Sequence, residues 1–227
     1  GQDSDNNLVD WVKMTNSVDT PPKNSYNGFN DPGNWRENPV GYASCPATNT
    51  IPSHVVISRV DARATLREHI ELYNPTCSDV SVAGWRIGGF ANGASGGIAL
   101  PGGAKIPGHG YYLITITNGL NTINGVSVDY NAGIDPGCCP AGNYIPDANG
   151  SARLTNGGLE VDRVGWGSGV GEGTSIANPN ANTFLERKAG YYSTMASNGV
   201  GGNHADRGNG QDSDNNLVDW VKMTNSV

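Results

Sequence analysis

The chain has few charged residues and no long hydrophobic run. Asp, Glu, Lys and Arg make up 15% of its 227 residues, against about 25% in an average globular protein. The formal net charge is −7 and Lys and Arg form no cluster, so the surface disfavours nucleic acid. No apolar run approaches the about 20 residues that cross a membrane. We therefore expect no nucleic-acid partner and no membrane span. No signal peptide is present either, but a secreted protein would have lost one.

Helical periodicity is also missing, and short strand-like runs take its place. The chain contains 33 Gly and 13 Pro, residues that supply the backbone conformations of turns. Between the turns lie runs such as Glu68–Tyr73, where apolar and polar residues alternate. The residues Thr155-Asn156-Gly157-Gly158 separate two such runs, which is a strong hairpin signal. About eight to ten short strands with regular turns predict a β-sandwich.

One segment occurs twice. Residues 1–18 and residues 210–227 share the sequence GQDSDNNLVDWVKMTNSV without a change. Repeats have to be interpreted before the fold is assigned. Two interpretations are open: the chain is a window from a longer tandem array, or each subunit carries two copies of one strand and lends one to a neighbour. Both indicate a protein that assembles.

Four motifs occur in order along residues 55–227. They are HIELYNP with VAGWRI (69–75 and 82–87), LEVDRVGW (159–166), FLERK (184–188) and GNGQDSDNNLVDWV (208–221). In this order they resemble the lamin-tail domain family, and the last motif resembles the closing sequence of its bacterial, extracellular members. The resemblance implies an all-β, immunoglobulin-like β-sandwich, here with an N-terminal strand and an irregular connector.

The resemblance also gives the repeated segment a place in the fold. In the family this segment is the last strand and is followed by a Pro-rich tail, which Asp19–Lys23 (DTPPK) resembles. We interpret residues 1–25 as the terminal strand and tail of a preceding or neighbouring unit, residues 26–54 as a connector, and residues 55–227 as the sandwich. An unpaired strand exposes its backbone groups, so the first copy is expected to pair with another unit.

The four cysteines indicate disulfides. An even number of cysteines in a Gly-rich, Lys-poor β protein favours an oxidising compartment, whereas no C-x-x-C or His spacing supports a zinc site. Adjacent cysteines bond awkwardly, so each of the neighbours 138 and 139 is better paired with one of the other two. The candidates are Cys45, Cys77, Cys138 and Cys139.

No catalytic constellation emerges, and we expect no enzyme. Residues 93–97 (GASGG) satisfy G-x-S-x-G, but the sequence Ile98-Ala99-Leu100-Pro101 that follows cannot be the helix that a nucleophile elbow needs. We expect the Trp residues of the strands to pack in the core. The carboxylates in strand-like runs are expected to point outward: Glu68, Glu71, Glu160, Asp162 and Glu186.

A calcium site is the one cofactor left open. The pattern Asp212-x-Asp214-x-Asn216 evokes a calcium loop, but Leu217 and Met223 stand where an EF-hand needs Gly and Glu. A site of another kind could use Asp206, Asp212 and Asp214. The alternative is that these Asp and Asn side chains bond to nearby backbone in a turn. Otherwise we expect no metal and no cofactor.

These features predict an extracellular or cell-surface structural protein whose partner is itself. It is expected to assemble head to tail into a filament, surface layer or matrix fibre through a shared terminal strand. The link between units is either one covalent tandem chain or a donated strand. The alternative function is a secreted accessory module that binds carbohydrate, cell wall or protein. The expected assembly residues are Leu8, Val9, Trp11, Val12, Leu217, Val218, Trp220 and Val221.

Overall fold

The computed structural model describes residues 52–63, 68–90, 97–116, 121–132, 145–205 and 207–224. The first copy of the repeated segment, the tail and almost all of the connector therefore lie outside the described residues. The same holds for GASGG except its last glycine. Among the predicted site residues, those outside the described residues are Leu8, Val9, Trp11, Val12, Cys45, Cys138, Cys139 and Asp206.

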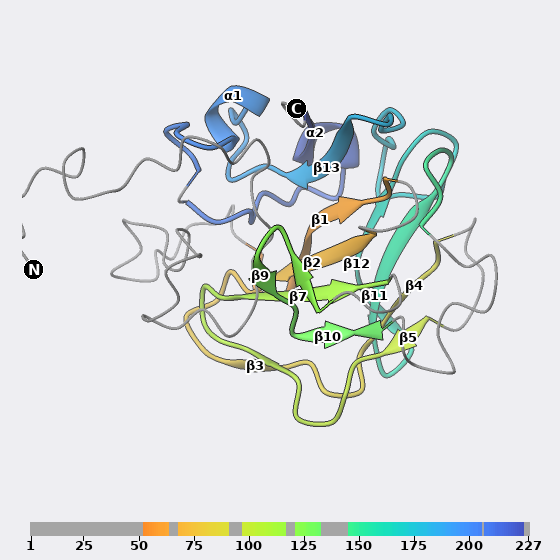
Figure 1. Cartoon of the computed structure of the whole chain (residues 1–227), viewed down its shortest axis with the longest axis vertical. Coiled ribbons are helices and arrows are strands. Elements are labelled where there is room, and N and C mark those ends of the chain that lie inside the picture. Colours follow the sequence, from red (N-terminus) through yellow and green to blue (C-terminus); the bar gives the residue numbers. More distant parts are fainter. Residues whose placement is uncertain are drawn as a thin grey trace, which may run out of the picture.

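A six-stranded sheet forms the first layer of the fold (Figure 1). All its strand pairs are antiparallel except β10 with β7, which run parallel. Among the described residues β14 is the edge strand on one side, and it pairs with β13. In spatial order the strands are β10 (Tyr130–Asn131), β7 (Tyr111–Thr115), β2 (His69–Tyr73), β1 (Val56–Asp61), β13 (Thr183–Arg187) and β14 (Trp220–Thr224).

A four-stranded antiparallel sheet forms the second layer. Its centre is the predicted hairpin: Gly157 and Gly158 form a two-residue turn with φ of 57° and 88°, the left-handed values that glycine adopts most readily. In spatial order the strands are β12 (Leu159–Gly165), β11 (Ser151–Asn156), β4 (Arg86–Gly88) and β5 (Ile98–Ala99). Two small pairs join β3 (Val80–Ser81) with β6 (Lys105–Ile106), and β8 (Thr122–Ile123) with β9 (Val126–Ser127).

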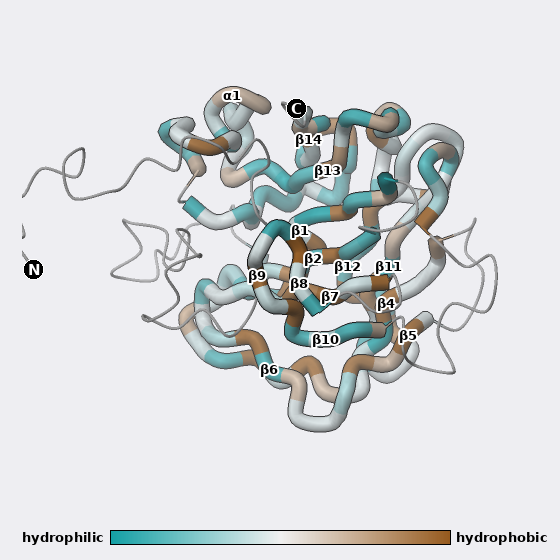
Figure 2. Tube along the Cα trace, viewed as in Figure 1, coloured by the Kyte–Doolittle hydropathy of each residue, from teal (hydrophilic) through white to brown (hydrophobic). Residues whose placement is uncertain are grey.

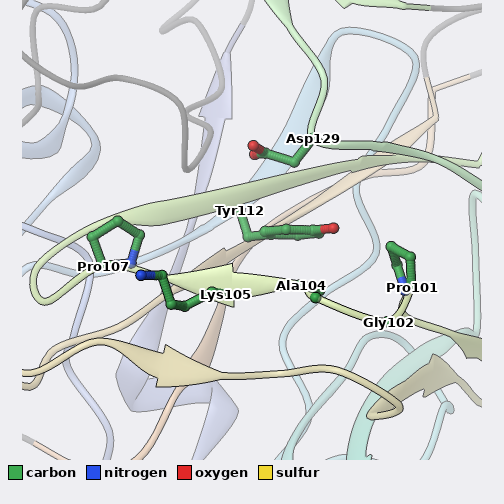
Figure 3. A pocket seen from close by; sticks show the side chains of 8 residues that line it. Pro101, Gly102, Ala104, Lys105, Pro107, Tyr112 and Asp129 are labelled. Atoms are coloured by element: carbon green, nitrogen blue, oxygen red, sulfur yellow. The ribbon is translucent and has the colours of Figure 1, made fainter.

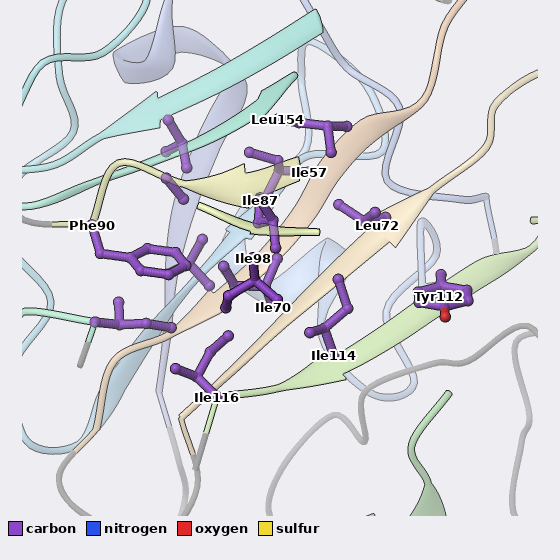
Figure 4. Close-up of a cluster of buried hydrophobic side chains, with 14 of the residues drawn as sticks. Ile57, Ile70, Leu72, Ile87, Phe90, Ile98, Tyr112, Ile114, Ile116 and Leu154 are labelled. Carbon is purple, nitrogen blue, oxygen red and sulfur yellow. The ribbon is translucent and has the colours of Figure 1, made fainter. Parts of the chain in front are cut away.

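The apolar core lies between the two sheets. Side chains of one parity along each strand meet there: Ile70 and Leu72 from β2 face Leu154 from β11 and Ile87 from β4 (Figure 4). Trp166 is fully buried in the same cluster. Figure 2 shows apolar residues along these strands, interspersed with polar ones. The architecture confirms the prediction of an all-β, immunoglobulin-like β-sandwich.

The last predicted strand is shorter than expected. Two one-turn helices occur near the C-terminus: α1 (Met195–Asn198), and α2 (Asn216–Asp219) directly before β14. The side chain of Asn215 accepts a hydrogen bond from the backbone N–H of Leu217 and caps α2. Leu217 and Val218 are therefore helical and not part of the strand, and Leu217 is 56% exposed. Placing these two residues in an assembly strand was wrong.

The prediction that the strand carboxylates point outward was also wrong for four of the five. Only Glu160 is exposed. In β1 and β2 every residue is buried, so these central strands are covered on both faces and alternation does not separate core from solvent. The buried carboxylates are Glu68, Glu71, Asp162 and Glu186.

Candidate functional site: the closing segment and its anchor

The C-terminal copy of the repeated segment completes the six-stranded sheet. We call its described part, residues 210–224, the closing segment. Its strand β14 pairs with β13 from Thr183 opposite Thr224 to Arg187 opposite Trp220. Trp220 is 2% exposed and belongs to the main core cluster. The closing segment is therefore an integral part of the sandwich.

Arg187 anchors the closing segment from the inside. Its side chain has no exposed surface and donates through Nη2 to both carboxylate oxygens of Asp162, at 2.7 and 2.8 Å. Nη1 donates to the carbonyl of Gln211 at 2.9 Å and to Asp212 at 3.0 Å, and Nε donates to the carbonyl of Ile57 at 2.7 Å. One guanidinium thus ties β1, β12 and the closing segment together, with every donor group used.

Trp220 lies against the same guanidinium. The centre of the Arg187 guanidinium is 4.9 Å from the Trp220 ring, within cation–π range. Burial alone would lower the pKa of Arg187, but the carboxylates of Asp162 and Asp212 outweigh it and raise the pKa. Arg187 therefore stays charged, and the closing segment supplies both a carboxylate and an aromatic face to it.

Asn216 fastens the closing segment to the other sheet. Its Oδ1 accepts from the backbone N–H of Gly165 at 2.8 Å and of Glu172 at 3.0 Å. Its Nδ2 donates to the carbonyl of Arg163 at 3.0 Å. Asn216 is fully buried, and its bond to Gly165 is buried as well, so losing the amide would leave that N–H without a partner.

Asp219 organises the turn inside the closing segment. Its carboxylate accepts from the backbone N–H and the hydroxyl of Ser213, both at 2.8 Å, and from the side chain of Gln211 at 3.2 Å. The backbone N–H of Asn215 donates to it as well, at 3.2 Å. The Asp- and Asn-rich sequence therefore folds into a turn bonded by its own side chains, as the alternative to a calcium loop predicts.

Three carboxylates approach one another beside Arg187. Oxygens of Asp162, Glu172 and Asp212 lie within 4.8 Å of each other, a group that could hold a metal ion. The Arg187 guanidinium already places a positive charge on two of them. Of the two predicted calcium candidates that the structure describes, Asp212 belongs to this group and Asp214 is exposed. A calcium site stays a prediction.

Three titrating groups meet at the closing segment: the pKa values of His54 and Glu172 are raised, and that of Asp212 is lowered. A hydrogen bond from His54 to Asp212, with a nitrogen–oxygen distance of 3.4 Å, raises the pKa of the imidazole. The His54 contact and the positive charge of Arg187 hold the pKa of Asp212 below its usual value against the effect of burial. Burial, together with the charges of Asp162 and Asp212, raises the pKa of Glu172 to about 8. Mild acid therefore favours the bonded arrangement.

Sequence reasoning missed Arg187, Asp162 and Asn216 as the partners that hold the closing segment. A usable signal was present in β12, where Asp162 has the same parity as the buried residues Val164 and Trp166. Side chains two residues apart in a strand share a face, so the alternation places this carboxylate in the core. A buried carboxylate then requires a cation.

Of the cysteine candidates, only Cys77 lies in the described part of the chain. It is exposed, and its Sγ lies 3.6 Å from Nε2 of His109. The other three candidates fall outside the described residues, so the disulfide pairing stays a prediction.

An open pocket of about 390 Å³ lies on another part of the surface (Figure 3). Its lining includes Tyr112, Lys105 and Asp129. Lys105 forms an ion pair with Asp79 at 2.7 Å, and Asp129 accepts the backbone N–H of Leu113 at 2.8 Å. These polar groups already have structural partners, and the pocket offers no nucleophile with a base.

Two packed, largely antiparallel sheets with an apolar core between them define the class as an immunoglobulin-like β-sandwich. The family model of the Lamin Tail Domain matches residues 48–168, more than half of the chain, and the chain belongs to this family. It is not an enzyme family. The matched span ends before β13 and the closing segment. No curated protein and no solved structure matches the chain. Across the described residues, no helix has the length and apolar character to span a membrane.

Proposed function

We propose that this lamin-tail protein is an extracellular structural protein that assembles head to tail through the repeated segment. One observation carries the proposal: the segment that closes the sandwich, anchored by Arg187 and Asn216, has a second, identical copy at residues 1–18. A domain needs one closing segment, so we assign the second copy to the link between one unit and another.

The N-terminal copy has every side chain that the closing segment uses. The identity extends over the polar turn as well as the strand, so it covers the contacts to Arg187 and to the loop after β12. Two sequences that are the same form the same contacts when they meet the same surface. The side chains Asp212, Asn216, Asp219 and Trp220 correspond to Asp3, Asn7, Asp10 and Trp11.

The geometry of the six-stranded sheet suits such a link. β14 lies at the edge of the described sheet and pairs with β13, so a strand of the same sequence from another unit could take its place there. The first copy can serve as the closing segment of a preceding unit in one tandem chain, or it can be donated to a separate subunit. A head-to-tail contact that does not return to its start gives an open filament. The Lys-poor, acidic composition and the even number of cysteines support an extracellular location.

Deleting residues 1–18 tests the proposal. The full chain is expected to form filaments in electron micrographs, and the deletion variant is expected to remain a folded monomer because it keeps the closing segment. As a control, residues 1–18 are replaced by a Gly/Ser sequence of the same length, which keeps the chain length but removes the repeat. Filaments that form from all three chains, or monomers from all three, would contradict the proposal.

A specific surface feature favours a second candidate, a binding module. Tyr191 and Tyr192 are 61% and 85% exposed, with ring centres 5.0 Å apart and planes at 87°. Exposed aromatic rings suit carbohydrate or protein ligands. The buried Trp166 and Trp220 are not available for this. Retardation in affinity electrophoresis through polysaccharide, lost when both tyrosines become alanine, would favour this candidate.

A further inference from the structure

The closing segment lies in a groove that the rest of the domain forms around it. We call this surface the acceptor groove. One side is the edge of β13, and the floor holds Arg187 and Asp162. The other side is the backbone after β12, where Gly165 and Glu172 donate to Asn216 and the N–H of Leu217 donates to the carbonyl of Thr174 at 2.8 Å.

We propose that the acceptor groove binds either copy of the repeated segment, so that residues 1–15 of a second chain replace residues 210–224 in it. This inference rests on the proposed function and specifies the partner and the place of binding. The partner is another copy of the same chain, and the binding mode is exchange inside the groove. The first copy does not add a seventh strand outside β14.

The extent of the identity favours exchange over edge addition. A strand added outside β14 would use the backbone and the side chains that correspond to β14, which are Trp11–Thr15. The identity also includes residues 2–10, whose counterparts form the polar turn. Asp212 bonds to Arg187, and Asn216 bonds to the backbone of β12 and of the loop after it, all inside the groove. The acceptor groove is therefore the surface that both copies match.

The fit around Asn216 makes the groove selective. A Cβ atom on Gly171 would lie 2.1 Å from Oδ1 of Asn216, and one on Gly173 would lie 2.8 Å from the carbonyl of Asp214. The loop after β12 therefore packs tightly against the turn of the closing segment. A segment with an apolar residue at the position of Asn216 would leave the buried N–H of Gly165 and the half-buried N–H of Glu172 without this acceptor.

The covalent connection of the closing segment to β13 decides which copy occupies the groove. Exchange keeps the same contacts, so it is close to neutral in contact energy. The closing segment follows β13 in the same chain, which gives it a high effective concentration at its own groove. The first copy of a second chain therefore gains occupancy when protein concentration is high or when the chain's own closing segment is weakened.

The experiment uses three full-length variants: Asn216→Ala, Asn7→Ala, and both together. At high protein concentration Asn216→Ala is expected to form dimers and larger species in light scattering. Its melting temperature is expected to stay within a few °C of the parent and to fall on dilution. The double variant is expected to melt about 10 °C lower at every concentration. Equal melting of Asn216→Ala and the double variant at all concentrations would overturn the proposal.

Lys13 and Lys222 provide a matched control. Lys222 occupies β14 but is exposed, so Lys13→Ala, Lys222→Ala and their combination are expected to melt with the parent. If the combined lysine variant loses as much melting temperature as the double asparagine variant, any change made in both copies destabilises the protein. That result would overturn the role of the groove.

A synthetic peptide of residues 1–15 separates this proposal from filament formation. Added to the double asparagine variant, it is expected to raise the melting temperature, and the same peptide with Asn7→Ala is not. If neither peptide does so, the groove proposal fails. If the parent stays monomeric while the peptide binds, the groove proposal stands and the filament fails. Filaments that form as well from Asn7→Ala would overturn exchange and leave head-to-tail assembly intact.

Discussion

Arg187 places a positive charge in the core with no exposed surface. Asp162 alone would neutralise it, but the guanidinium also reaches Asp212 and two backbone carbonyls. A buried pair adds little by itself, whereas removing one partner leaves an uncompensated charge. At the residue scale, stability therefore depends on the whole set of partners being present together.

The variant Arg187→Met tests this dependence. It keeps an apolar side chain of similar length but leaves Asp162 buried without its cation, so the free energy of unfolding is expected to fall by about 3–5 kcal/mol. Urea denaturation followed by tryptophan fluorescence measures it. Combining Arg187→Met with Asp162→Asn removes both charges and is expected to recover part of the loss. If the free energy of unfolding of Arg187→Met lies within about 1 kcal/mol of the parent's, the buried pair does not contribute to stability in this way.

At the element scale, the loop between β12 and β13 decides whether the closing segment fits. It presents backbone directly to the turn, because Gly171 has no side chain where Asn216 needs the space. α2 and β14 then follow in positions set by that contact. The one-turn helix α2 would not be stable alone, since a single turn fixes several dihedral angles for one hydrogen bond.

Gly171→Ala is expected to destabilise the protein by about 1–3 kcal/mol, because its Cβ would lie 2.1 Å from Oδ1 of Asn216 and 2.8 Å from the backbone nitrogen of Gly165. Gly102→Ala is the matched control, since its Cβ would meet nothing within 4 Å. Differential scanning calorimetry compares the two. Equal melting temperatures would mean that the closing segment is not packed tightly against this loop.

At the scale of the whole molecule, the partly or fully buried acidic groups make stability depend on pH. Burial and nearby carboxylates raise the pKa of Glu172 from 4.5 to about 8 and that of Glu68 to about 7. The folded state holds these protons while the unfolded chain gives them up above its ordinary pKa, so stability falls as pH rises from about 4.5 to 8. His54 acts in the same direction, because its pKa is raised by Asp212 and its contribution is lost as pH rises through that value.

The melting temperature is therefore expected to be highest near pH 5 and to decrease towards pH 8. Below about pH 4 it is expected to fall again, because Asp61 and Asp212 have lowered pKa values and their contribution disappears on protonation. Thermal scans in a series of buffers measure the curve. Glu172→Gln is expected to flatten the slope between pH 5 and 8, and an unchanged slope would contradict the assignment of this group.

Particular residues show where sequence reasoning reached its limit. The alternation of Ile70 and Leu72 and the turn at Gly157 identify strands, because each depends on neighbours along the chain. Arg187 and Asp162 lie 25 positions apart, and no local pattern indicates that their side chains meet. Glu71 was expected to be exposed because alternation assumes that one face of the strand is in contact with solvent, but both faces of β2 are buried.

The sequence by itself determined that this protein is built from short strands, that it belongs with the lamin-tail domains, and that one segment occurs twice. These properties depend on local sequence patterns or on sequence comparison. Only the tertiary structure decided what the C-terminal copy does in the domain: part of it is a turn and a helix, and it bonds to Arg187 of one sheet and, through Asn216, to the backbone of the other. The physical reason is that side chains become buried and paired only when strands distant in the chain come together. The sequence of one segment does not indicate which residues these partners are.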